Sequence, residues 1–125
     1  MSDAYTFLRE PKAEKTQYTY RTVLKNDVGV AIGPADLTAL QGTLFDQDTG
    51  AIINSFDTVG ILNTDRGTLD ASGNLAITLR PADMVILNAA LAYETHILKI
   101  RLTFGATGER NHSVGFRVEN MSRVA

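Results

Sequence analysis

The chain has 125 residues, 44% of them hydrophobic and 21% charged, which suits one folded domain with its own core. A formal net charge of −2 provides no general attraction to nucleic acid or anionic membranes, and the lack of cysteine excludes disulfides, thiol catalysis and cysteine-ligated zinc. Because residues 1–15 contain no signal-peptide-like apolar run and no stretch approaches a membrane span of about 20 apolar residues, we expect a chain made in a reducing compartment with no membrane partner.

Residues 1–16 are predicted to form an N-terminal arm rather than a strand. They follow no sustained hydrophobic period, and Pro11 interrupts them. Tyr5, Phe7 and Leu8 are nevertheless large apolar side chains. Two interpretations remain open. The segment is either a frayed terminus or extra edge strand of the domain, or an arm that adds to a neighbouring subunit and is anchored by its aromatic rings.

From residue 17 onward, apolar residues recur with the two-residue period of β-strands. The alternation predicts strands at residues 17–25, 39–46 and 51–56. Between the last two lies DQDTG (46–50), which invites comparison with a calcium loop. In an EF-hand loop, however, Gly50 would occupy a position that needs an acidic ligand, and no helix is predicted on either side. Asp and Thr before Gly instead favour a tight turn that pairs Phe45 with Ile53.

The middle of the chain contains one clear strand and one helix-like segment. NLAITLR (74–80) places Leu75, Ile77 and Leu79 on one face, and a turn is predicted just before it at residues 70–74. PADMVILNAALA (81–92) begins with a proline, which suits a first helical turn, and its length allows a turn or two. We therefore expect one short helical connection there.

The last third of the chain predicts a β-hairpin. YETHILKIRLTF (93–104) and HSVGFRVENM (112–121) each alternate apolar and polar residues. An Ala106-Thr107-Gly108 loop with a left-handed Gly108 would connect them. That loop pairs Ile100 with Val114 and Leu98 with Phe116, which puts both apolar rows on one face.

Together these segments predict an all-β sandwich or small barrel of about seven strands, with residues 1–16 as an arm and residues 17–125 as the domain.

The residues with catalytic or metal-binding chemistry form no recognisable constellation. In the predicted hairpin, His96 and His112 lie roughly 20 Å apart, too far to share an ion. No serine lies in a Gly-x-Ser-x-Gly elbow, and neither GxGxxG nor GxxxxGK occurs. We therefore predict no catalytic, cofactor-binding or metal-binding residue. Lys99, Arg101 and Arg117 form a basic stripe on the polar face of the last hairpin, and without interleaved aromatic residues a solvated face is favoured over an oligonucleotide site.

Three stretches resemble the immunoglobulin-like domains of tailed-phage virion proteins, over about residues 17–125. They are LKNDVGVAIGPADLTALQGTLFDQDTGAIINS, GNLAITLRPADMVILNAALAYETHILKIRLTFG and HSVGFRVENMSRV. In that family a D-x-D-x-G hairpin follows the second strand, a P-A-D turn follows the fifth, and the next strand starts near a tyrosine. The matching positions are residues 46–50, residues 81–83 and Tyr93. Because the Cys…Trp…Cys core of antibody domains is absent, the likeness to antibody domains is limited to the architecture.

The resemblance implies an immunoglobulin-like β-sandwich with a non-enzymatic structural role in a tailed-phage particle, as a capsid decoration or a head–tail, tail or baseplate component. Such a protein would be made in the bacterial host cytoplasm and localised in the virion. It would dock on a symmetric lattice of major capsid, connector or tail proteins, or form a homo-oligomer, with no nucleic-acid partner. The predicted contact residues are Tyr5, Phe7, Leu8, Lys99, Arg101 and Arg117.

The alternative function is a sandwich module that binds carbohydrate or a host surface. It requires exposed aromatic residues, of which the chain offers no Trp and only 4 Tyr.

Overall fold

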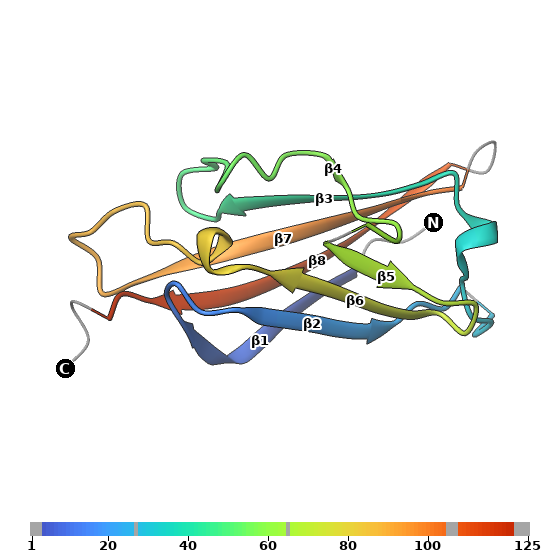
Figure 1. Ribbon diagram of the computed structural model, residues 1–125, viewed down its shortest axis with the longest axis horizontal. Coiled ribbons are helices and arrows are strands. Elements are labelled where there is room, and N and C mark those ends of the chain that lie inside the picture. Colours follow the sequence, from blue (N-terminus) through green and yellow to red (C-terminus); the bar gives the residue numbers. More distant parts are fainter. Residues whose placement is uncertain (1–3, 27, 65, 105–107, 122–125) are drawn as a thin grey trace.

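The protein is an all-β molecule built from two sheets, as seen in a computed structural model that describes residues 4–26, 28–64, 66–104 and 108–121. The strands of the larger sheet, in spatial order, are β1 (Ala4–Ala13), β8 (Glu109–Glu119), β7 (Tyr93–Thr103), β3 (Ala39–Asp46) and β4 (Val59–Gly60). Those of the smaller sheet are β2 (Tyr18–Val23), β6 (Asn74–Leu79) and β5 (Gly67–Leu69). Two short 3-10 helices, η1 (Pro34–Asp36) and η2 (Pro81–Asp83), connect strands (Figure 1). The prediction of an all-β, two-layered protein is confirmed.

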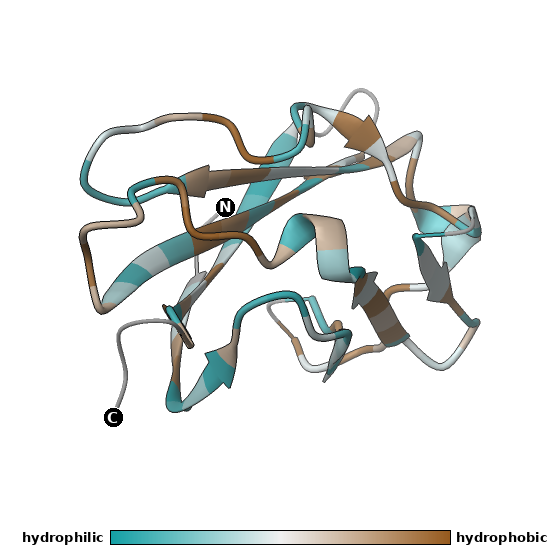
Figure 2. Ribbon diagram, turned by 60° about the vertical axis from the view of Figure 1, so that its left-hand side comes forward, coloured by the Kyte–Doolittle hydropathy of each residue, from teal (hydrophilic) through white to brown (hydrophobic). Residues whose placement is uncertain are grey.

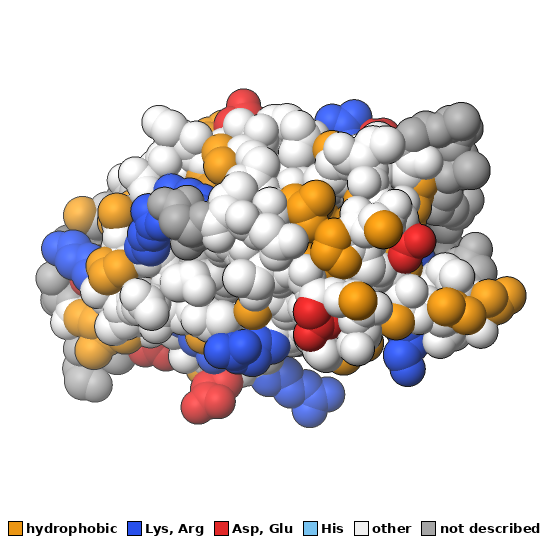
Figure 3. Space-filling view, turned by 45° about the vertical axis from the view of Figure 1, so that its right-hand side comes forward, with side chains coloured by type: hydrophobic (Ala, Val, Ile, Leu, Met, Phe, Trp, Pro, Cys, Tyr) orange, Lys and Arg blue, Asp and Glu red, His pale blue; other side chains and the backbone are white. Residues whose placement is uncertain are grey.

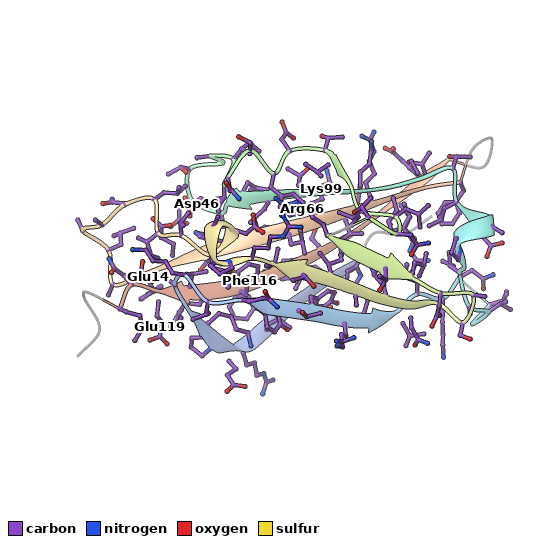
Figure 4. The ribbon with its side chains drawn as sticks, viewed as in Figure 1. Glu14, Asp46, Arg66, Lys99, Phe116 and Glu119 are labelled. Atoms are coloured by element: carbon purple, nitrogen blue, oxygen red, sulfur yellow. The ribbon has the colours of Figure 1, made fainter. Side chains whose placement is uncertain are left out.

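One hydrophobic core lies between the sheets, and the two-residue period builds it. Leu75, Ile77 and Leu79 of β6 are buried as predicted, and they share a cluster with Leu98 and Ile100 of β7. Figure 2 shows the alternation of hydrophobic and hydrophilic residues along the strands. Side chains fill the space between the sheets (Figure 4), while hydrophobic and charged side chains are interspersed on the face that Figure 3 presents. No helix in the described ranges is long and apolar enough to span a membrane.

The N-terminal segment is an edge strand of the larger sheet, so the prediction of an arm rather than a strand is wrong for Ala4–Ala13. β1 runs parallel to β8, from Ala4 opposite His112 to Leu8 opposite Phe116, and the register then shifts before Lys12. Pro11 lies in this irregular stretch, where an edge strand tolerates the missing N–H. Leu8 packs against the core. The edge-strand alternative left open by the sequence is the one that the structure contains.

The β7–β8 hairpin forms, but its register differs by two residues from the predicted one. Leu98 lies opposite Val114, and Ile100 lies opposite His112. A shift of two residues leaves every side chain on its predicted face, so the apolar rows still meet the core. Gly108 has the predicted positive φ, +100°, and its carbonyl accepts the Phe104 N–H at 2.8 Å. Ala106 and Thr107 of the predicted loop lie outside the described residues.

The DQDTG segment turns the chain as predicted, although the strand predicted after it does not form. The Gly50 N–H donates to the Asp46 carbonyl at 2.8 Å, and Gly50 has a φ of +75°. Phe45 bridges Ile52 rather than Ile53. Two residues further on, Asn54 and Ser55 have φ values of +53° and +55°, which are incompatible with an extended strand.

The short helical connection predicted within residues 81–92 is present as the single turn η2, and the rest of the segment is not helical. The N–H groups of Leu87 and Asn88 donate to the carboxylate of Glu94, at 2.9 and 2.8 Å, instead of to helical carbonyls. A segment this short gains too little from helical hydrogen bonds to compete with such tertiary partners. A second helical turn, η1, was not predicted; its Asp36 accepts from the Gly33 N–H at 2.9 Å.

Candidate docking surface

Five of the six contact residues predicted from the sequence lie on the outer face of the larger sheet. Successive side chains of a strand point to opposite faces, so the burial of Leu98 and Ile100 in the core turns Lys99 and Arg101 outward. By the same alternation the other outward residues are Tyr5 and Phe7 of β1 and Arg117 of β8. Leu8 is the exception, since it points into the core.

An apolar row crosses this face over four adjacent strands. Pairing places Phe7 of β1 beside Gly115 of β8, then Ile97 of β7, then Phe45 of β3. We call these four residues the outer apolar row. A Cβ on Gly115 would come within 3.1 Å of Phe7 Cδ1 and would also collide with the Tyr5 ring. The missing side chain at Gly115 therefore leaves room for both aromatic rings beside this position of β8.

The outer apolar row is separate from the core between the sheets. Ile97 is only 6% exposed, yet it does not belong to the core cluster. Tyr5 and Phe7 remain 56% and 45% exposed. An apolar cluster on the outside of a sheet, with two half-exposed aromatic rings, is typical of a surface that another molecule covers.

Basic side chains flank the outer apolar row. Lys99 (labelled in Figure 4) lies one row away, between Ser113 and Thr43 of the neighbouring strands. It lines a hollow of about 320 Å³ on the outer face, whose walls are Gln41, Thr43, Phe45, Asp57, Thr58, Lys99 and Arg101. Lys99 thus places a positive charge beside the apolar row.

Arg101 and Arg117 are held in place by neighbours on the same face. Arg101 Nε donates to Glu109 Oε2 at 2.6 Å, and this hydrogen bond, together with the charge of Glu109, raises the pKa of Arg101. The guanidinium of Arg117 lies 3.9 Å from the centre of the Tyr93 ring, in a cation–π contact. Both arginines are therefore partly preorganised, which lowers the entropy lost when they bind a partner.

A separate polar cluster is buried where β3 ends and β7 begins. Among the described residues, one group of three His, Asp or Glu side chains brings possible ligand atoms within 4.8 Å of one another, and it consists of Asp46, Glu94 and His96. His96 Nε2 lies 2.9 Å from Glu94 Oε1, and Asp46 Oδ2 accepts from the backbone N–H and the hydroxyl of Thr49 at 3.0 and 2.8 Å. An ion would have to displace these bonds, which fasten the turn after β3 and the loop before β7.

The two histidines have separate surroundings. His96 is fully buried opposite Phe116, whereas His112 lies opposite Ile100. The two histidines are therefore separated by four residues along the hairpin. At the strand rise this is about 13 Å, instead of the predicted roughly 20 Å.

Phe45 and Ile97 are the members of this surface that sequence reasoning missed. Each one breaks the alternation of its strand, because Leu44-Phe45 and Ile97-Leu98 are consecutive apolar pairs. An extra apolar residue on the polar face of a strand is the signal that identifies such a patch.

Comparison with protein-family models, with curated proteins and with solved structures found no match to this chain. Its function must therefore be argued from this surface and from the sequence itself.

Proposed function

We propose that this chain is a non-enzymatic structural protein that binds another protein through the outer face of its larger sheet. One observation carries the proposal. Phe7, Ile97 and Phe45 form an apolar row across a rigid sheet, outside the core, and Lys99 lies directly beside it.

The composition of this face suits a protein partner. Protein interfaces derive most of their binding free energy from a few central aromatic and arginine side chains surrounded by a polar rim. Tyr5, Phe7 and Phe45 provide the aromatic centre, and Arg101 and Arg117 provide the rim. The complementary partner surface would be apolar in its centre and acidic at its edge.

The partner that we propose is a lattice of virion proteins. The resemblance of residues 17–125 to immunoglobulin-like domains of tailed phages supports a place in the capsid, neck, tail or baseplate, reached after synthesis in the bacterial cytoplasm. The all-β architecture with two sheets supports the immunoglobulin-like assignment at the level of fold class. Because β1 pairs within its own sheet, it would contribute Tyr5 and Phe7 to the docking face rather than exchange with a neighbouring subunit. Major capsid, connector or tail proteins, or further copies of the chain, would contact that face.

One observation favours the alternative of a carbohydrate- or host-surface-binding module. Tyr5 and Tyr93 are half exposed on the outer face, and sugar rings stack on such aromatic rings. Arg117 already covers one side of Tyr93, which leaves less of that ring available. We therefore rank this function second.

Cosedimentation tests the proposal. Purified chain is mixed with particles of the encoding phage that were assembled without it, and the bound fraction is measured over a range of chain concentrations. A Phe7→Ser/Lys99→Glu variant should bind at least about ten-fold more weakly, because it removes a central ring and reverses a flanking charge. Val23→Ser is the matched control, since Val23 is an exposed apolar residue of the other sheet.

The outcomes separate the two functions. Equal binding by the variant and the control would refute the docking face. A chain that binds no particle but is retained on a glycan array through Tyr5 would favour the alternative.

A further inference from the structure

A second hollow lies at one end of the molecule, between the end of β2 and the start of β8. Its volume is about 460 Å³, and its lining residues are Thr22, Val23, Leu24, Lys25, Asn26, Gly29, Ile32, Leu102, Arg110 and His112. Three of them are basic, and none is Asp or Glu. A hollow of this size is large enough for a small organic ion. It shares no residue with the docking face described above.

Within the described ranges, the two permanent charges in this hollow have no acidic partner. Neither Lys25 nor Arg110 forms an ion pair with a carboxylate in the described part of the chain. Arg110 Nη1 donates to the backbone carbonyl of Lys25 at 3.1 Å, which holds the guanidinium beside the end of β2 and leaves its other N–H groups for a ligand. Two cations therefore face one concave space whose described lining residues include no carboxylate.

His112 adds a third, titratable group to the same wall. Its Nε2 lies 3.0 Å from the hydroxyl of Tyr20, and the two rings stack with centroids 6.1 Å apart. Burial, and after it the nearby charge of Arg110, lowers the pKa of His112.

We propose that this hollow binds a small oxyanion with two negative charges, such as phosphate, between Lys25, Arg110 and His112. A planar guanidinium presents N–H groups in the fork geometry that phosphate oxygens accept, and an ammonium adds a second point charge. Two permanent cations and a protonatable imidazole match a dianion better than a monocarboxylate. The buried side chains of Ile32 and Leu102 form the apolar wall that strengthens these contacts by excluding water.

The test uses the imidazole of His112 as a probe of occupancy. Inorganic phosphate is titrated into the full chain at constant ionic strength, with chloride and acetate as separate arms, and the His112 ring signals are followed by NMR across pH. We expect a saturable shift with phosphate alone. Bound phosphate should raise the pKa of His112, because a nearby dianion stabilises the protonated ring.

Matched variants identify the residues responsible. Arg110→Gln should weaken phosphate binding at least about ten-fold, the value of one charge-assisted hydrogen bond. Arg21→Gln removes the same charge from β2 at a position outside the hollow and should leave the affinity unchanged. Lys25→Gln, at an exposed site, serves as a second variant should Arg110→Gln unfold.

The proposal is overturned by a response that does not saturate, by an equal response to chloride or acetate, or by equal phosphate affinity in the Lys25, Arg110 and Arg21 variants.

Discussion

The substitution Asp83→Ala should destabilise the protein more than replacement of any exposed acid. The side chain of Asp83 is fully buried and accepts three hydrogen bonds. Its donors are Asn54 Nδ2, Arg66 Nη1 and the Arg80 N–H, each at 2.8 Å. The Arg66 side chain is itself only 17% exposed, and its guanidinium stacks on Phe56. One carboxylate therefore joins three separate segments of the chain.

The expected loss in the free energy of unfolding follows from the donors that remain buried without an acceptor. Without Asp83, a mostly buried guanidinium loses its counterion and two further donors lose their acceptor. Removal of one partner of a buried ion pair costs about 3–5 kcal/mol. Domains of this size have a free energy of unfolding of about 5–15 kcal/mol. The midpoint of thermal unfolding should therefore fall by roughly 10–20 °C.

Urea and thermal denaturation followed by circular dichroism measure this loss. Asp57→Ala is the control, because Asp57 is exposed and the one described hydrogen bond of its side chain is accepted from the neighbouring Thr58 hydroxyl. Adding Arg66→Met to Asp83→Ala should recover part of the loss, since neither charge then remains buried. A loss below about 1 kcal/mol, indistinguishable from that of Asp57→Ala, would refute the reasoning.

Three further predictions concern other parts of the fold. Deletion of residues 1–14 should lower the melting temperature or abolish the cooperative melt, because it removes the pairing of β1 with β8 and the contact of Leu8 with the core. An unchanged melt by circular dichroism would contradict this. Gly73→Ala should destabilise the protein by more than about 1 kcal/mol in urea, because φ is +82° and the new Cβ would lie 2.5 Å from the Leu24 carbonyl oxygen; Gly60→Ala, where a Cβ meets open space, is the control. In phosphate-free buffer, the contribution of His112 to the free energy of unfolding should be full above about pH 6.5 and should be lost as pH falls through its lowered pKa. The reason is that the unfolded chain takes up the proton at a higher pH than the folded chain does. If the pH profile of urea unfolding were the same in His112→Gln, this prediction would be contradicted.

Local pattern was sufficient for the strands in which apolar and polar residues alternate clearly. The alternation of residues 39–46, 74–80 and 93–104 predicts β3, β6 and β7 with nearly the correct ends. Glycine predicts the turns at Gly50 and Gly108 because a positive φ is a local requirement that favours glycine. These features depend on steric and hydrophobic preferences within a few residues, which any reader of the sequence can apply.

The candidate surface was predictable in part. Strand alternation places Lys99, Arg101 and Arg117 on one polar face, as the structure also has them. That Tyr5 and Phe7 join the same face depends on β1 pairing with β8, a contact between segments about a hundred residues apart. The periodicity of a sequence does not indicate which distant strands will pair. The pairing of β1 with β8 is stabilised by hydrogen bonds and packing that exist only after the chain has folded.

The sequence by itself determined the all-β class, most of the strands and the turns, because each follows from short-range periodicity and glycine geometry. Only the tertiary structure decided that residues 4–13 are an edge strand, that residues 51–56 are irregular, and that Asp83 is buried among its three donors. It also decided that Lys25, Arg110 and His112 line one hollow. The physical reason is the same in each case: long-range partners compete for backbone and side-chain groups, and the partner that gains the most burial and hydrogen bonding overrides the local preference.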